Sequence, residues 1–274
     1  MIHIATVHWQ DDRWIDIQLK YLKSNITRPF KIYAFLNDLE RDHRSKFFYS
    51  SSEPIQSHAI KLNLLADMAA FNAEHEDDLL IFIDGYAFPV GNIIEFAHSK
   101  LNEYSLIAIQ RRENGGDIQP HPSFCLTTIK FWREINGDWK QGFGWKSARG
   151  EYLSDVGGNL LKILNDKRID WYPMLRSNRR DLHPLWFGLY EDLIYHHGSG
   201  FRQPLCRGDL AKLSAMSYLY YKKFERLPRW VRKAIPERFR PMAGIKRENT
   251  AASEKVFASI LSDPLFYKFF KQSD

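Results

Sequence analysis

One apolar stretch limits the possible folds of this chain more than any other. Residues 79–83 are five consecutive apolar residues, preceded by two aspartates and followed by Asp84 and Gly85. A run of this length between charges and turn residues predicts a strand that is buried on both faces of a parallel sheet. Ligands of open α/β sheets bind beyond the carboxyl ends of the strands. We therefore expect Asp84 at a ligand site, where its oxygens can hold a divalent cation, while Gly85 allows close approach of the backbone.

A second interpretation of Asp84 is purely structural. An aspartate that follows a strand often forms a turn or caps the next helix. Short motifs discriminate weakly between such roles, so the choice depends on the rest of the chain.

The N-terminal third of the chain predicts alternating strands and helices. Residues 2–7 and 31–36 have the apolar character of strands, and the apolar positions between Trp14 and Leu22 indicate an amphipathic helix. A second helix, over residues 58–71, leads to the apolar run. This order predicts an α/β fold with a mixed, mostly parallel, Rossmann-type sheet flanked by helices.

Polar side chains follow the first two predicted strands. His8 and Asp11 come after the first strand and Asp38 after the second, where other doubly wound sheets bind the base and ribose of a nucleotide. Lys61 lies off the apolar stripe of its helix, so it faces either solvent, which is the commoner position for lysine, or a ligand.

Later loops carry further candidate residues. Residues 139–151, which include Trp145, are rich in Trp and Gly and form either an exposed aromatic platform or a packed loop. His121 and His183 each precede a proline, and each lines a pocket or has a structural role. Asp155 is either the N-cap of the helix predicted to follow it or a residue that faces a site.

The charge of the chain is unevenly distributed. The net charge is +6, but residues 202–247 contain 13 Lys and Arg against 3 Asp and Glu, an excess of ten positive charges that leaves −4 for the remainder. A basic segment of this kind favours an anionic partner. From about residue 208 aromatic side chains interleave with the basic ones, which suits either an interface with anionic lipid or a helical lid with solvated flanks.

Other features of the composition exclude several classes of protein. Two cysteines are too few for a disulfide framework and fit a reducing compartment. We find no signal-peptide pattern and no run that approaches about 18 uncharged apolar residues. We expect a cytoplasmic protein, with peripheral contact to the inner membrane face as an open alternative. We expect one domain over residues 1–207 and a basic helical extension over 208–274, whose last apolar positions, 253–261 and 264–270, dock onto the body.

Two separated stretches together resemble the bacterial glycosyltransferases of the GT-A fold. The first runs from His58 through Leu64 and Leu65 to residues 78–89, where an apolar strand ends in Asp84-Gly85-Tyr86 and continues to a proline. The second is residues 197–202, His-Gly-Ser-Gly-Phe-Arg. They are similar to the Asp-x-Asp signature and to the C-terminal His-x-x-Gly element of those enzymes. The resemblance covers roughly residues 1–205 and leaves out the basic tail.

This resemblance implies a GT-A-like sheet and a specific chemistry. A sugar would move from a nucleotide-sugar donor to a saccharide or lipid-linked saccharide acceptor, such as a bacterial surface polysaccharide or glycolipid. Asp84 and His197 would hold Mn²⁺ or Mg²⁺, and Asp155 would be the catalytic base if the reaction inverts stereochemistry. The residues expected to bind the donor and its diphosphate are His8, Asp11, Asp38, Lys61, Asp84, Gly85, Gly200 and Arg202. Those expected on the acceptor side are His121, Trp145 and His183.

The chain departs from the family signature at one position, where Tyr86 replaces the second aspartate. Either metal binding is weaker, or Asp84 and His197 suffice, or the reaction relies on Arg202 and neighbouring cations without a metal. A catalytically inactive nucleotide-binding protein of the same fold is therefore a rival. A nucleic-acid-binding protein that uses the tail is a weaker rival, because no RNA or DNA module is recognisable, and we expect no nucleic-acid partner.

Overall fold

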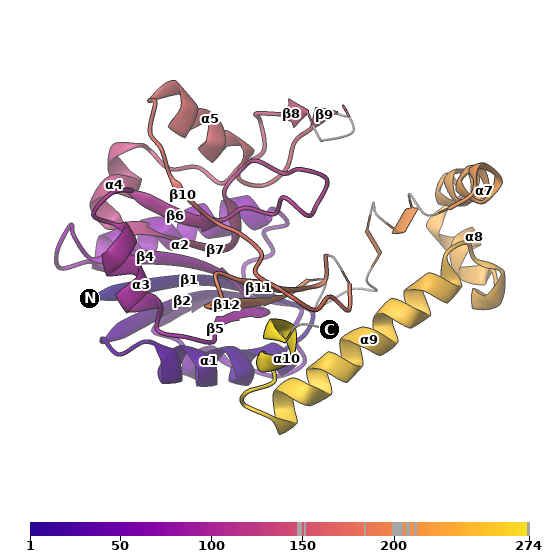
Figure 1. Ribbon diagram of the computed structural model, residues 1–274, viewed down its shortest axis with the longest axis horizontal. Helices are drawn as coiled ribbons and strands as arrows, with labels where there is room; N and C mark the ends of the chain where they lie inside the picture. The colour runs from indigo at the N-terminus through magenta and orange to yellow at the C-terminus, as the bar shows by residue number, and fades with distance from the viewer. Residues whose placement is uncertain are drawn as a thin grey trace.

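Two sheets with surrounding helices form the body of the molecule, and an arm extends away from it (Figure 1). The computed structural model describes residues 1–146, 150, 152–183, 185–198, 205–206, 209–210 and 213–272.

The main sheet has seven strands in the order β10-β6-β7-β4-β1-β2-β3. Strand β1 pairs in parallel with both β2 and β4, whereas β7 is antiparallel to β4 and β6. The predicted mixed, mostly parallel sheet is confirmed, although its apolar run has one antiparallel neighbour. The strands are β1 (Ile2–Trp9), β2 (Phe30–Asn37), β3 (Tyr49–Ser51), β4 (Leu79–Asp84), β6 (Leu106–Ile109), β7 (His121–Thr128) and β10 (Tyr172–Met174).

Helices cover both faces of the main sheet, as Figure 1 shows. In β4, Ile81 and Ile83 pack with α1 and α3, while Leu80 and Phe82 pack with α2, α4 and α5. This alternation follows from the period of two in a strand and explains why the run has no polar residue. The helices are α1 (Arg13–Asn25), α2 (His58–Asn72), α3 (Ile93–Lys100), α4 (Ile129–Glu134) and α5 (Gly158–Asp166), with a 3₁₀ turn η1 at Arg44–Lys46.

A smaller antiparallel sheet lies beside the carboxyl ends of the main strands. Its order is β11-β12-β5, formed by β11 (Phe187–Tyr190), β12 (Ile194–His197) and β5 (Ala87–Pro89). A separate hairpin pairs β8 (Trp145–Lys146) with β9 (Tyr152–Leu153). Strands β5 and β12 are neighbours although about a hundred residues separate them in the chain, so the smaller sheet brings a late segment next to Asp84.

The last part of the chain returns to the body. Side chains of α9 (Ala243–Ser262) and α10 (Lys268–Lys271) share one core with α1 and the smaller sheet. Phe257 meets Trp14 edge to face, with the ring centroids 5.0 Å apart, and Phe266 contacts Phe88 and Tyr195. The expectation that these final apolar positions dock onto the body is confirmed.

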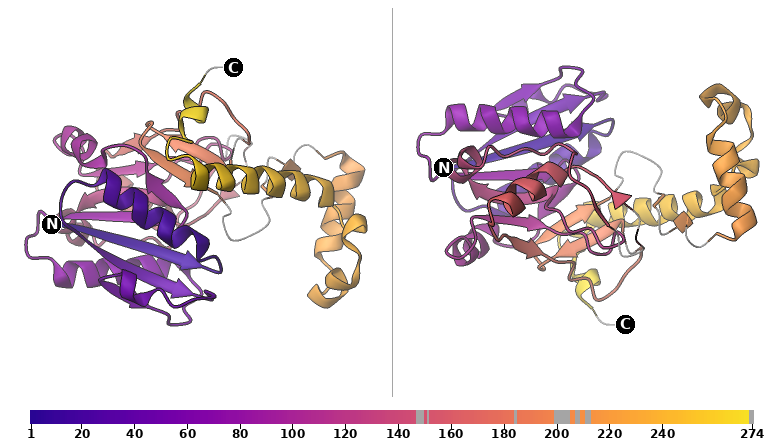
Figure 2. Two further views of the ribbon diagram at one scale, coloured as in Figure 1. Left: turned by 90° about the horizontal axis from the view of Figure 1, so that it is seen from below. Right: turned by 90° about the horizontal axis from the view of Figure 1, so that it is seen from above.

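We use the name arm for residues 215–240, which form α7 (Ala215–Glu225), α8 (Arg229–Ala234) and the 3₁₀ turn η2 (Glu237–Phe239). Both views in Figure 2 place α7 and α8 beyond the outer end of α9, away from both sheets, so they form no lid over the main sheet. The expected boundary at 207 and 208 falls outside the described residues, and the division into two domains stays a prediction. Within the part of the chain that the structure describes, no helix combines the length and apolar character needed to cross a bilayer.

Gln18 of α1 connects the central strand to the turn that follows β4. Its buried amide Nε2 donates to the carbonyl oxygens of Asp84 (2.7 Å) and Ala87 (2.9 Å). Its Oε1 accepts hydrogen bonds from Thr6 Oγ1 (3.2 Å) and His8 Nε2 (3.1 Å). Both donors and both acceptor positions of the amide are thus used, and one side chain fixes the backbone on both sides of Gly85.

Replacing Gln18 with Leu should lower the free energy of unfolding by about 2–4 kcal/mol, because each buried partner left without a hydrogen bond costs roughly 1–3 kcal/mol. Urea unfolding followed by circular dichroism measures the change. Gln141→Leu, at an exposed glutamine, is the control and should have little effect. Equal stability of the two variants would contradict this role of Gln18.

Candidate functional site

A cavity of about 470 Å³ lies at the carboxyl ends of β1 and β4. Asp84 ends β4 beside it, and the smaller sheet supplies another part of its wall. Five of the predicted site residues line this cavity: Lys61, Asp84, His121, Trp145 and Asp155. Further lining residues include Trp9, His58, Tyr86, Arg111, Trp186 and His196.

Asp84 lies between two imidazoles. His58 Nε2, at the start of α2, is 3.2 Å from Oδ1, and His196 Nε2, in β12, is 3.6 Å from Oδ2. Burial by itself would raise the pKa of Asp84, but the contacts with His196 and His58 outweigh it and hold the pKa well below its usual range. The carboxylate is therefore charged at neutral pH and has imidazole nitrogens at both oxygens.

The structure does not bring His197 to Asp84, which corrects the predicted metal pair. His197 is fully buried, with Nδ1 2.9 Å from the Tyr195 hydroxyl and Nε2 2.8 Å from Ser253 Oγ. Successive residues of a strand point to opposite sides, so His196 faces the cavity and His197 faces the core beneath α9. The imidazole beside Asp84 is that of His196.

Lys61 faces the cavity and not the outer surface, which was the commoner alternative for a lysine. It is only 3% exposed, and its Nζ lies 5.5 Å from the ring centre of Trp9 and 5.9 Å from that of Phe35. Among the described residues no carboxylate forms an ion pair with it, although the charge of Asp38 acts on it. Burial lowers the pKa of Lys61. Because a buried charge is costly unless it is paired, an anion bound in the cavity would stabilise the ammonium group of Lys61.

A second cation lies on the cavity wall contributed by the segment between β6 and β7. Arg111 Nη1 is 3.2 Å from His121 Nε2, and His121 Nδ1 is 2.8 Å from Ser123 Oγ. Burial, followed by the charge of Arg111, holds the pKa of His121 well below its usual range. His121 is therefore neutral at pH 7 and accepts from the guanidinium, which it orients at the cavity.

Two predicted donor-side residues, His8 and Gly85, support the site from behind. His8 does not line the cavity; it is 2% exposed and bonded to Gln18. A Cβ on Gly85 would lie 2.6 Å from both His8 Nδ1 and the carbonyl oxygen of Val7. Since the backbone of β1 cannot move away, position 85 requires glycine for close packing beneath Asp84.

The remaining donor-side predictions have other placements. Asp11 binds the guanidinium of Arg13 through both oxygens, and it does not line the cavity. Asp38 accepts a hydrogen bond from Trp9 Nε1 (2.7 Å), so it positions an aromatic ring that does line the cavity. Gly200 and Arg202 lie outside the described residues.

Trp145 and Asp155 lie on the wall formed by the segment between β7 and β10. Trp145 is 4% exposed and belongs to a small cluster with Leu153 and Leu161, which favours the packed loop over the exposed platform. Asp155 is exposed, and its Oδ1 accepts the backbone N–H of Val156 (2.8 Å). Gly157, and not Asp155, is the N-cap of α5, so the carboxylate of Asp155 remains at the cavity.

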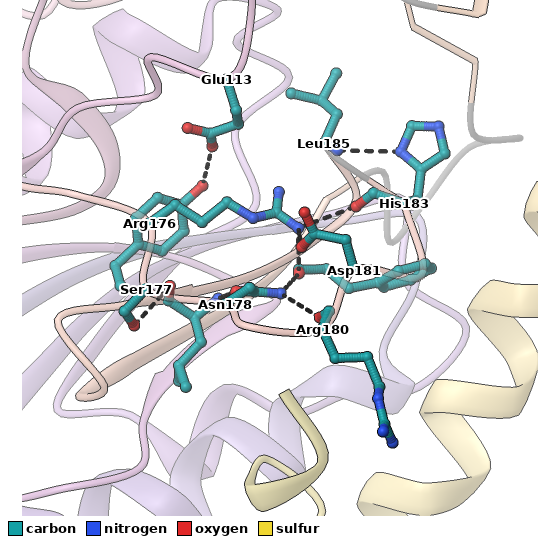
Figure 3. Close-up of polar contacts among 11 residues, drawn as sticks. Glu113, Arg176, Ser177, Asn178, Arg180, Asp181, His183 and Leu185 are labelled. Atoms are coloured by element: carbon teal, nitrogen blue, oxygen red, sulfur yellow. Dashed lines mark hydrogen bonds and ion pairs between the residues drawn. The ribbon is translucent and has the colours of Figure 1, made fainter. Parts of the chain in front are cut away.

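His183 is a structural residue of a loop and does not line the cavity. Its Nδ1 accepts the backbone N–H of Leu185 (3.1 Å), and its Nε2 is 3.1 Å from Asp209 Oδ1. Figure 3 shows the loop around it, in which Arg176 Nη2 donates to Asp181 Oδ1 (2.7 Å) and to the carbonyl oxygen of His183 (3.0 Å). His183 therefore does not take a place on the cavity wall, and an acceptor-side role for it stays a prediction.

Two groups of side chains offer atoms that bind metals. At Asp84, a carboxylate and the imidazole of His196, whose ring nitrogens have no hydrogen-bond partner among the described residues, suit Mn²⁺ better than Mg²⁺, which prefers oxygen ligands. In the second group, the ligand atoms of His183, Cys206 and Asp209 all lie within 4.8 Å of one another. Both ring nitrogens of His183 already have partners, so a metal there would have to displace a hydrogen bond, and Asp84 is the better candidate.

Comparison with known proteins gives similarity to solved structures only. No family model matches the chain, and neither does any curated protein. The structures that are similar to it are GT-A-type glycosyltransferases, the class that the sequence motifs resemble.

Three of these structures illustrate the extent of the similarity. Residues 1–349 of Staphylococcus aureus TarS in complex with UDP have 11% identity and a TM-score of 0.38, and the match covers 51% of this chain and 50% of that one. The catalytic domain of Drosophila β1,4-galactosyltransferase 7 with xylobiose has 14% identity and a TM-score of 0.38, over 77% and 79% of the two chains. The galactosyltransferase LgtC with donor and acceptor sugar analogues has 9% identity and a TM-score of 0.35, over 60% and 70%. TM-scores below 0.5 carry no argument, so the function is argued from the cavity.

Sequence reasoning missed His58, His196 and Arg111. The pair His196-His197 signalled that one imidazole would face each side of a strand, but the sequence does not say which side is the cavity. His58 is the first residue of α2, directly after the helix cap Ser57. A side chain at the start of such a helix can face the ends of the neighbouring strands. Arg111 is the second residue after the end of β6. Its place just beyond a strand end was the signal that could have identified it.

Acidification should destabilise the protein through His8. Burial of this side chain lowers its pKa to about 4. The unfolded histidine binds a proton near pH 6.5, so the folded state loses stability as the pH falls from 6.5 toward 4, at up to about 1.4 kcal/mol per pH unit. Urea unfolding at pH 7 and pH 5 measures this slope. His8→Gln should reduce it, and His98→Gln, at an exposed histidine, should not. An unchanged slope in His8→Gln would contradict the assignment.

Proposed function

We propose that this protein is a glycosyltransferase that uses a nucleotide-sugar donor. The observation that carries the proposal is the combination, in one cavity at the strand ends, of the charged Asp84 with two cations that have no carboxylate partner among the described residues, Lys61 and Arg111. A nucleoside diphosphate presents the negative charge that such cations bind.

The donor would bind with its diphosphate between Lys61 and Arg111. Trp9, held by Asp38, offers an aromatic face for the nucleobase at the end of β1. Gly85 lets the turn after Asp84 pack closely against β1, behind the cavity. In this arrangement the two cations would stabilise the negative charge that develops on the diphosphate as it leaves, which is the largest charge change of the reaction.

A divalent cation would be held by Asp84 together with His196. It would add positive charge near the diphosphate. Tyr86, in the place of a second aspartate, contributes no carboxylate; its ring lies 5.5 Å from that of His196 and packs against it. Lys61 and Arg111 supply part of the charge that a fuller metal site would provide, and we expect binding of the nucleotide to weaken, but not to disappear, when metal is removed.

In an inverting reaction Asp155 would take the proton of the acceptor hydroxyl. The hydroxyl oxygen then forms a bond to the anomeric carbon while the bond from that carbon to the diphosphate oxygen breaks. The electron pair of the broken bond stays on the diphosphate, and the proton stays on Asp155. Asp155, Lys61 and Arg111 all line the same cavity.

The acceptor would be a saccharide, and we propose a bacterial surface polysaccharide or glycolipid. Trp145 and Trp186 line the same cavity as Asp155; they are 4% and 3% exposed, so only a small part of each ring would contact a sugar. A lipid-linked acceptor would require contact with a membrane surface.

One rival is a nucleotide-binding protein of this fold without catalytic activity. It is favoured by Tyr86 and by the two imidazoles at Asp84, which occupy the carboxylate in the absence of ligand. Binding of a nucleoside diphosphate without turnover of any nucleotide sugar would support this rival.

Asp84→Asn should lower hydrolysis or transfer of the active nucleotide sugar by at least about a hundredfold, because a neutral amide binds a divalent cation more weakly than a carboxylate and can accept a hydrogen bond from only one of His58 and His196. A panel of nucleotide sugars, followed by release of the nucleotide, identifies the donor and gives the rate. Asp67→Asn, at an exposed position of α2, is the matched control. Full activity of Asp84→Asn would remove Asp84 from the mechanism.

Lys61→Met should weaken binding of a nucleoside diphosphate about tenfold or more, since a charged hydrogen bond to phosphate is lost. The free energy of unfolding should be unchanged or higher, because the variant no longer buries an ammonium group. Titration calorimetry with UDP and GDP, next to urea unfolding, measures both quantities. Lys130→Met, at an exposed lysine, is the control. Retained affinity in Lys61→Met would contradict the assignment.

A further inference from the structure

The arm exposes large apolar side chains to an unusual degree. Met216 is 76% exposed, Trp230 74%, Phe239 57% and Leu219 50%. Met216, Leu219 and Tyr220 are spaced by three and four residues, so they share one side of α7. In a helix that packs on a protein body this side would be buried; here it is exposed, on a helix that lies away from both sheets (Figure 2).

The same segment is strongly basic. Residues 215–240 contain eight Lys and Arg against two Asp and Glu. One of the two acidic residues, Glu225, is neutralised by Arg232 at 2.6 Å. Arg240 donates to the carbonyl oxygens of Ile235 and Lys233. Most of the other basic residues of the arm are exposed, as the apolar side chains are.

We propose that the arm binds the surface of a bilayer that contains anionic lipid. Tryptophan and tyrosine side chains prefer the headgroup level, where the ring meets the acyl region and the polar edge meets water. Lys and Arg near an anionic surface are attracted to the lipid headgroups, and each adds to the affinity. Helices that combine both features lie in the plane of the interface, and the arm has both on short helices that are largely exposed within the described part of the chain.

Two other partners fit this surface less well. A second copy of the chain would bring two segments with an excess of six positive charges against each other, because each arm has eight basic and two acidic residues. A nucleic acid would match the charges but would leave Met216, Leu219 and Phe239 in water, since phosphates and base edges offer these aliphatic and aromatic groups little apolar surface.

The position of the arm relates the membrane to the cavity. The carboxyl ends of β1, β2 and β4, where the cavity lies, point to the same side of the body as the arm in Figure 1. Helix α9, 20 residues and about 30 Å long, sets the distance between them. A lipid-linked saccharide could thus reach the cavity from the bound surface; this consequence, unlike lipid binding itself, rests on the proposed transferase function.

Co-sedimentation of the whole chain with vesicles tests the proposal. We expect binding to vesicles of phosphatidylglycerol mixed with phosphatidylcholine, weakened by added salt, and little binding to phosphatidylcholine alone. Leu219→Ser combined with Trp230→Ser should weaken binding about tenfold or more, and so should Arg226→Gln combined with Arg229→Gln.

Matched controls keep these comparisons specific to the arm. Phe71→Ser removes a side chain that is 86% exposed on α2, and Lys23→Gln with Lys130→Gln removes two exposed charges from the body. Both controls should bind vesicles as the unchanged chain does, and all variants should keep their nucleoside diphosphate affinity. Absence of vesicle binding, equal loss in the controls, or tighter binding to oligonucleotides than to anionic vesicles would overturn the proposal. Vesicle binding without any sugar transfer would instead support lipid binding by the arm and contradict the proposed glycosyltransferase activity.

Discussion

The buried amide of Gln18 is the interaction on which the geometry of the site depends. This single side chain of α1 forms hydrogen bonds with Thr6 and His8 of β1. It also binds the backbone carbonyl groups of Asp84, at the end of β4, and of Ala87, at the start of β5. The turn at Gly85 would otherwise expose two carbonyl groups to an apolar interior, which is costly. Because Ala87 begins β5, the same amide sets where the smaller sheet starts, and through β12 it sets where His196 meets Asp84.

The cavity is built from charges that the fold holds apart. Asp84 has imidazoles at both oxygens, whereas Lys61 and Arg111 have no carboxylate partner among the described residues. Burying such cations costs stability, and functional sites commonly carry costs of this kind. An anionic ligand would offset the cost on binding. In the proposed function, Lys61 and Arg111 would supply part of the positive charge that a fuller metal site would provide, which is consistent with Tyr86 in the place of the second aspartate of the family signature.

The sequence predicted the elements whose pattern is local and missed those that depend on pairing across the chain. The apolar run at β4 and the stripe of α1 identified the main sheet and its helices, because burial on both faces or on one side leaves a direct signature. Strands β5 and β11 are three and four residues long and are defined by partners far away in the chain. The choice of His197 over His196 failed for the same reason, since the phase of β12 is set by its pairing with β5. The sequence allowed Lys61 to face either solvent, the commoner position for a lysine, or a ligand. Only the packing of Trp9 and Phe35 around it shows that it faces inward.

A crystal structure of the protein with UDP and Mn²⁺ is the measurement that tests the central claim most directly. The account predicts phosphate oxygens within hydrogen-bond distance of Lys61 Nζ and the guanidinium of Arg111, with any bound metal at Asp84 and His196. A nucleotide bound elsewhere on the molecule, or one whose phosphates lie away from both cations, would contradict it.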